Sequence, residues 1–139
     1  MLEQSLIIRT VLAHYPDVQG IYLFGSYGTS DESSDSDIDI ALLLPPLKAK
    51  NEGYLALSPC RQALAESLRK EVDLVIARQL STVLQKEIVA NGRLIHCTDR
   101  YAVDEFEMLV LSYYYYQKLN DERREIVDAF IETGRAYAV

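Results

Sequence analysis

The most constraining feature of this sequence is a pair of aspartates inside an apolar run. Asp37 and Asp39 flank Ile38, and the apolar residues continue to Leu44 before Pro45 interrupts them. The run predicts a strand that ends before Pro45, because proline cannot continue a hydrogen-bonded ladder. Alternate residues of a strand share a face, so both carboxylates should point to one side while Ile38 points into the core.

Two carboxylates on one face of an apolar strand repel each other unless positive charge lies between them. Asp73 interrupts a second apolar run, Val72–Ile76, in the same way. If the two strands pair, at ~4.8 Å, the carboxylates of Asp37, Asp39 and Asp73 can hold two Mg²⁺ ions ~3.5–4 Å apart. We expect one ion to bind nucleotide phosphates and the other to activate an attacking hydroxyl, with Asp73 as its ligand and as proton acceptor.

A glycine–serine pair precedes the aspartates. Gly25 and Ser26 follow a β-rich run at residues 21–24, and ten residues separate Ser26 from Asp37. Glycine lets a backbone approach phosphate oxygens closely, and the serine hydroxyl and nearby N–H groups can donate to them. The pair alone is a weak signal, but its position at a strand end before the two aspartates predicts a triphosphate site.

The segment GSYGTSDESSDSDID resembles the signature of the DNA polymerase β-like nucleotidyltransferase superfamily. More narrowly, the chain resembles the minimal nucleotidyltransferase (MNT) antitoxins over nearly its whole length, including VDLVIA, LQKEIVANGRLIH and YAVDEFEMLVLSYY. The resemblance implies an α+β nucleotidyltransferase fold, a small mixed β-sheet flanked by helices with a C-terminal helical tail. It also implies catalytic and metal-binding roles for Asp37, Asp39 and Asp73, and triphosphate binding by Gly25 and Ser26.

One departure from the family pattern concerns positive charge. Members often carry a basic residue a few positions after the Gly-Ser pair, whereas residues 27–30 contain none. How the charge of the triphosphate is balanced therefore stays open. Arg69, Lys70 and Arg78 flank the third predicted strand and could reach phosphates, although surface charge is the simpler interpretation.

The resemblance further implies an antitoxin that transfers AMP from ATP, with Mg²⁺, to a tyrosine hydroxyl of a cognate HEPN ribonuclease toxin. The chain is too short for an added domain that grips a primer or acceptor, so we expect another protein to supply the acceptor within a hetero-oligomer. Two alternatives remain. The protein could neutralise its partner by binding alone, through its acidic surface and a helix containing Tyr113–Tyr116. It could also modify a small molecule such as an aminoglycoside.

Composition narrows the functional classes. The net charge of −7 argues against a protein that directly grips nucleic acid. No apolar run approaches the ~20 residues that span a bilayer, and the N-terminus does not resemble a secretory signal. Cys60 and Cys97 are too few for a disulfide framework. We expect a cytoplasmic protein with one domain, residues 1–139, divided into a catalytic core (1–98) and a C-terminal helical segment (99–139).

The rest of the chain alternates helical and extended patterns. Ser81 is the expected N-terminal cap of a helix at residues 81–90, and Asn91-Gly92 is expected to end that helix. From Asp99 onward the pattern is helical, either one helix or two broken near Asn120. The other segments predicted are a helix at 2–14, a loop at 47–58, a helix from Pro59, a helix at 81–90 and a strand at 94–96.

Overall fold

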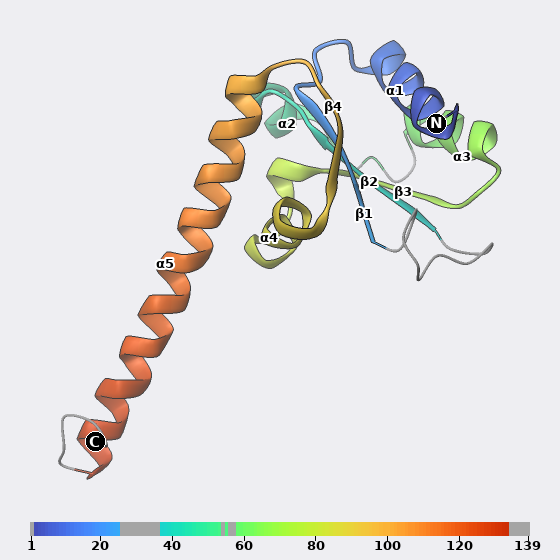
Figure 1. Ribbon diagram of the computed structural model, residues 1–139. Helices are drawn as coiled ribbons and strands as arrows, with labels where there is room; N and C mark the ends of the chain where they lie inside the picture. Colours follow the sequence, from blue (N-terminus) through green and yellow to red (C-terminus); the bar gives the residue numbers. More distant parts are fainter. Residues whose placement is uncertain (1, 26–36, 54, 56–57, 134–139) are drawn as a thin grey trace.

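A computed structural model describes residues 2–25, 37–53, 55 and 58–133. A four-stranded mixed sheet forms its centre, with helices on both faces (Figure 1). The strands are β1 (Gly20–Phe24), β2 (Ile38–Leu43), β3 (Val72–Ile76) and β4 (Arg93–Cys97). The helices are α1 (Leu2–His14), α2 (Pro46–Asn51), α3 (Pro59–Leu68), the 3-10 turn η1 (Ala77–Gln79), α4 (Thr82–Asn91) and α5 (Arg100–Thr133). The expected α+β architecture, a small mixed sheet flanked by helices with a C-terminal helical tail, is confirmed.

The strand order in the sheet is β3-β2-β1-β4. β1 runs antiparallel to both of its neighbours, whereas β2 and β3 are parallel. The expected pairing of the two aspartate-bearing strands is therefore confirmed. The edge strand β3 begins beside the start of β2. The aspartates of these two strands therefore lie at the same end of the sheet.

Each face of the sheet buries its own apolar cluster. On one face Ile38, Ile40 and Leu42 are fully buried against α1 and α3, as the alternation in β2 predicted. On the other face Ala41 and Leu43 pack against α4 and the first turns of α5. Since Asp39 alternates with Ile38 and Ile40, its side chain belongs to this second face.

The predicted loop at 47–58 is wrong in its first part, where the chain forms α2. Pro46 occupies the first turn of α2, where its fixed φ favours a helix and no N–H is needed. Ala49 is buried, and its carbonyl accepts a hydrogen bond from Gln79 Nε2. Tertiary contacts therefore stabilise a helix that is too short for its periodicity to be read from the sequence.

The other helix ends agree with the sequence. Ser81 caps α4 by accepting a hydrogen bond from the Leu84 N–H, and α4 ends at the Gly92 cap. Ser58 caps α3 in the same way, with Pro59 in its first turn. Both serines satisfy N–H groups that a helix start leaves without an intrahelical partner.

The C-terminal segment that was predicted to be helical forms one continuous helix, α5, without a break near Asn120 (Figure 1). Its first turns are held by Val103, Phe106 and Val110, which are buried in the second cluster. None of residues 111–132 is buried, and the helix projects away from the sheet. No helix in the described part of the chain meets the length and hydropathy needed to cross a membrane. The division of the chain at residue 98 stays a prediction.

Arg78 is a structural residue. Its Nε donates to the Leu44 carbonyl at 2.6 Å, and its Nη2 donates to Gln19 Oε1 at 2.7 Å. The guanidinium also lies 5.6 Å from the centre of the Phe106 ring. These contacts join the end of β2 to α5, so Arg78 is engaged within the fold rather than aimed at a phosphate site.

We expect Arg78→Ala to lower the free energy of unfolding by about 2 kcal/mol, because it leaves the Leu44 carbonyl without this donor. Chemical denaturation followed by circular dichroism measures the change. Arg124→Ala, at an exposed position on α5, is the control and should change stability by less than about 0.5 kcal/mol. Equal stability of the two variants would contradict the structural role of Arg78.

Candidate functional site

The parallel pairing of β2 and β3 places Asp39 directly beside Asp73. The Ile38 N–H donates to the Glu71 carbonyl at 2.9 Å, and this bond sets the register. Paired residues of neighbouring strands point to the same face, so the two carboxylates face each other. Asp37 precedes β2 by one residue and is exposed.

Negative charge is concentrated at this point. The pKa of Asp39 is raised to about 6, first because the side chain is half-buried and then because it hydrogen-bonds with Asp73. The charges of Asp73 and Asp37 raise it further. The other two sequence-predicted aspartates therefore both act on Asp39. A positive group placed among them would relieve this repulsion.

Gly25 leaves room for the Asp39 carboxylate. β1 pairs Phe24 with Asp39, so the turn after β1 begins beside that side chain. Gly25 has a φ of 76°, and a Cβ built on it would lie 2.2 Å from Asp39 Oδ2. The sequence suggested that a glycine here admits phosphates. The structure adds that only glycine leaves this space to the carboxylate. Ser26, the second predicted triphosphate residue, lies outside the described residues.

A pocket of about 520 Å³ adjoins the two carboxylates. Asp39 and Asp73 line it together with Phe24 from β1 and Leu84 from α4. The remaining lining residues are mostly apolar and come from β3, η1 and the segments before and within α3: Leu55, Arg61, Val72, Leu74, Val75, Ile76, Gln79 and Leu80. A wall of this kind suits a flat apolar group beside a polar reacting atom.

Sequence reasoning did not identify Arg61, the basic residue that lines this pocket. Its Nε donates to the Val72 carbonyl at 2.9 Å, and its Nη2 lies 2.9 Å from Glu71 Oε2. Arg61 thereby holds the start of β3, one residue before Asp73. Its position eleven residues before Val72 carries no periodic or motif signal that would have singled it out.

The described residues contain no group of three or more His, Cys, Asp or Glu side chains already arranged around a metal position. Asp39 and Asp73 meet, and Asp37 acts on Asp39 through its charge. The donor set consists of carboxylate oxygens, the ligand type that Mg²⁺ prefers. The metal-binding and catalytic roles of the three aspartates, and the triphosphate role of Gly25, stay predictions.

A mixed sheet with facing aspartates on two parallel strands, beside a glycine turn, is the arrangement of a nucleotidyltransferase domain. The family model described as "Polymerase beta, Nucleotidyltransferase" matches residues 7–101, a span that includes β1 to β4 and all three aspartates. The chain therefore belongs to this family.

Known proteins resemble the chain over nearly its full length. The protein adenylyltransferase MntA of Shewanella oneidensis is 36% identical over 137 residues, which cover 99% of this chain and 94% of that protein. A crystal structure of a toxin–antitoxin pair with AMP-PNP contains a chain that is 34% identical with a TM-score of 0.71, covering 92% of this chain and 98% of that one. An MNT antitoxin bound to the tri-AMPylated HEPN toxin of Shewanella oneidensis is 35% identical, with a TM-score of 0.68, covering 94% and 97%.

We expect Gly25→Ala to lower the free energy of unfolding by about 1–3 kcal/mol. The new Cβ would collide with Asp39 Oδ2, and the positive φ is unfavourable for alanine. Gly53→Ala is the matched control, because nothing lies within 4 Å of a Cβ at that position. Denaturant titration of both variants measures the difference. A Gly25→Ala protein as stable as the control would show that Asp39 does not need this space.

Asp39→Asn should raise the stability of the metal-free protein at pH 7.5 by about 1 kcal/mol, a value reduced for partial exposure. The raised pKa of Asp39 means that ionisation disfavours the fold, so its cost grows as the pH rises from about 4 to 6. The advantage of the variant should therefore shrink at pH 4.5. Denaturation in EDTA at both pH values measures it, with Asp128→Asn on the exposed part of α5 as control. A destabilised Asp39→Asn protein would contradict the repulsion.

Proposed function

We propose that this protein is an antitoxin that transfers AMP from ATP to a tyrosine hydroxyl of a cognate HEPN ribonuclease toxin and thereby neutralises it. The observation that carries the proposal is the pairing of Asp39 with Asp73 beside Gly25. Membership of the nucleotidyltransferase family and the likeness to MntA support the chemistry. The likeness to antitoxins solved with their HEPN toxin supports the partner. We infer a cytoplasmic location from the sequence.

The order of the strands suggests where each substrate lies. Gly25 follows β1, Asp39 lies on β2 and Asp73 lies on the edge strand β3, so the three form a line across the sheet. We place the triphosphate of ATP at the Gly25 end, where the backbone can approach it closely. The acceptor hydroxyl then lies at the Asp73 end, and the apolar wall of the pocket receives the tyrosine ring.

The transfer is a displacement at the α-phosphorus of ATP. The tyrosine oxygen forms a bond to this phosphorus, the bond from the phosphorus to the bridging oxygen breaks, and pyrophosphate leaves. We assign Asp73 as the acceptor of the tyrosine proton, because it faces the pocket from the edge strand. The AMP left on the toxin adds bulk and negative charge, which oppose RNA binding.

Asp37, Asp39 and Asp73 are the residues that would hold Mg²⁺, in keeping with their oxygen donors and the raised pKa of Asp39. When bound, Mg²⁺ supplies charge neutralisation for the triphosphate and makes the attacking hydroxyl more acidic. The chain itself holds the carboxylates of Asp39 and Asp73 side by side. Arg61 and the β2–β3 pairing keep Asp73 beside Asp39.

Incubation of both proteins with ATP and Mg²⁺ should raise the intact mass of the toxin by whole AMP units, as measured by mass spectrometry. The Asp37→Asn/Asp39→Asn variant should transfer AMP at least ~10³-fold more slowly, because the carboxylates are required in the transition state. The exposed double variant Asp121→Asn/Asp128→Asn controls for loss of charge.

Two results would contradict the proposal. An unmodified toxin, with ATP bound to the wild-type protein, would exclude AMP transfer to it. Full neutralisation in cells by the Asp37→Asn/Asp39→Asn variant would favour neutralisation by binding alone. Labelled ATP supplied with a panel of aminoglycosides distinguishes the small-molecule alternative, since only that activity labels a drug.

A further inference from the structure

The exposed apolar side chains of α5 gather on one side of the helix. At about 100° per residue, all of them fall within a sector of roughly 160°. The large hydrophobic residues that α5 exposes are Tyr101, Met108, Leu109, Tyr113, Tyr115, Tyr116, Leu119, Ile126, Val127, Phe130 and Ile131. We call this set the α5 stripe. It extends over nearly the whole length of the helix.

The α5 stripe is not a continuation of the protein's own core. Val103, Phe106 and Val110 bind α5 to the sheet, and the centre of the stripe lies about 140° around the helix from Val110. Beyond Val110, the side that would continue this packing carries carboxylates instead. Asp121, Glu125, Asp128 and Glu132 all fall within about 60° of Val110. Four carboxylates of α5 therefore lie on the side that faces its own domain, whereas Glu105 and Arg123 fall within the sector of the stripe.

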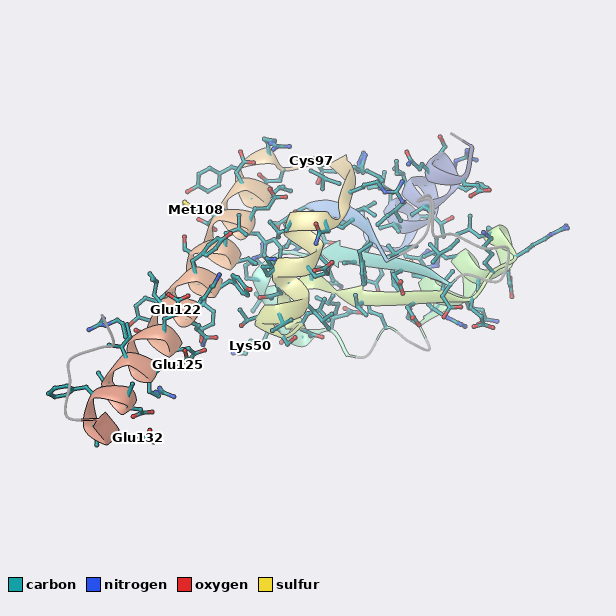
Figure 2. The ribbon with its side chains drawn as sticks, turned by 60° about the horizontal axis from the view of Figure 1, so that its bottom comes forward. Lys50, Cys97, Met108, Glu122, Glu125 and Glu132 are labelled. Carbon is teal, nitrogen blue, oxygen red and sulfur yellow. The ribbon has the colours of Figure 1, made fainter. Side chains whose placement is uncertain are left out.

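The projecting half of α5 has little support within the chain. Residues 121–132 are all exposed, and Figure 2 shows Glu122, Glu125 and Glu132 on the part of the helix that extends beyond the sheet and the other helices. Within the described residues, the ring of Tyr114 contacts the body of the protein through the Lys86 ammonium, which lies 5.2 Å from the ring centre. An unsupported helix of this length is marginal in water, and tertiary packing normally stabilises it.

The stripe is large enough for a specific interface. Its side chains are each about half exposed or more, from Phe130 at 46% to Tyr101 at 77%. At roughly 100 Å² for each, they present about 1,000 Å², near what one partner contributes to a standard protein–protein interface. Monomeric proteins rarely expose contiguous apolar patches above a few hundred Å².

Charge indicates which partner covers it. Residues 111–132 carry five acidic and three basic side chains, and the whole chain has a net charge of −7. Two copies of this chain would bring two acidic helices together, which is unfavourable. A ribonuclease must attract RNA phosphates, so we expect its surface to be basic. An apolar groove on a basic protein complements the stripe in shape and the net charge of this chain in sign.

We propose that the α5 stripe is the surface that holds the protein substrate, and that the toxin presents it with an apolar groove on a basic surface. This inference rests on the proposed function, since it takes the toxin as the partner. Docking takes place on a helix that projects away from the sheet (Figure 1). A toxin held there keeps its tyrosine at a high effective concentration near the pocket. Binding and modification then depend on different residues of the same chain.

The test measures binding without transfer, in an Asp37→Asn/Asp39→Asn background, by titrating the toxin in a calorimeter. Leu119→Glu/Ile126→Glu should weaken the Kd at least about 100-fold, because two central apolar contacts become charged. Lys118→Gln/Arg124→Gln is the matched control. It changes the net charge by the same amount outside the stripe and should alter the Kd by less than about 3-fold. Glutamate favours helices, and circular dichroism checks that α5 is retained.

Two outcomes would overturn the proposal. The first is toxin binding by Leu119→Glu/Ile126→Glu as tight as that of the control. The second is a dimer of the isolated chain in light scattering that this variant converts to a monomer, since a second copy would then occupy the stripe. If the wild-type chain binds toxin through the stripe yet transfers no AMP to it, the docking surface stands while the proposed transfer fails.

Discussion

The structure depends on the pairing of β2 with β3, which holds two like charges side by side. Parallel hydrogen bonds fix Asp39 beside Asp73, and neither strand can shift without moving apolar residues out of the core. Hydrophobic burial on both faces of the sheet therefore maintains an electrostatically unfavourable contact. Burial is the main cause that raises the pKa of Asp39, and the hydrogen bond with Asp73 and the charges of Asp73 and Asp37 raise it further. Such local strain is typical of sites whose ligands carry the opposite charge.

Several contacts around the two strands keep this arrangement in place. Arg61 fixes the carbonyl of Val72 at the start of β3, and Arg78 joins the end of β2 to α5. Gly25 contributes by the absence of a side chain, because Asp39 Oδ2 occupies the space that a Cβ would fill. The helix that packs on the carboxylate face, α5, then continues outward as an apolar surface for a partner. The helix that carries the proposed docking surface is therefore packed on the same sheet that carries the candidate site.

Much of this frame could be predicted from the sequence, because it depends on local patterns. Alternation around Ile38 predicted the strand and the side on which Asp39 lies, and Ser81 predicted the start of α4. The features that were missed depend on contacts between distant segments. α2 is held by Ala49 and its contact with η1, the steric role of Gly25 depends on the β1–β2 register, and the pocket is lined from several segments of the chain.

The most direct test of the site is a crystal structure of the protein with Mn²⁺ and a non-hydrolysable ATP analogue, using anomalous scattering to locate the metal. We predict metal peaks at ligand distance from both Asp39 and Asp73, with the triphosphate against the turn that begins at Gly25. A nucleotide bound elsewhere, or no metal peak between the two carboxylates at saturating Mn²⁺, would contradict the account.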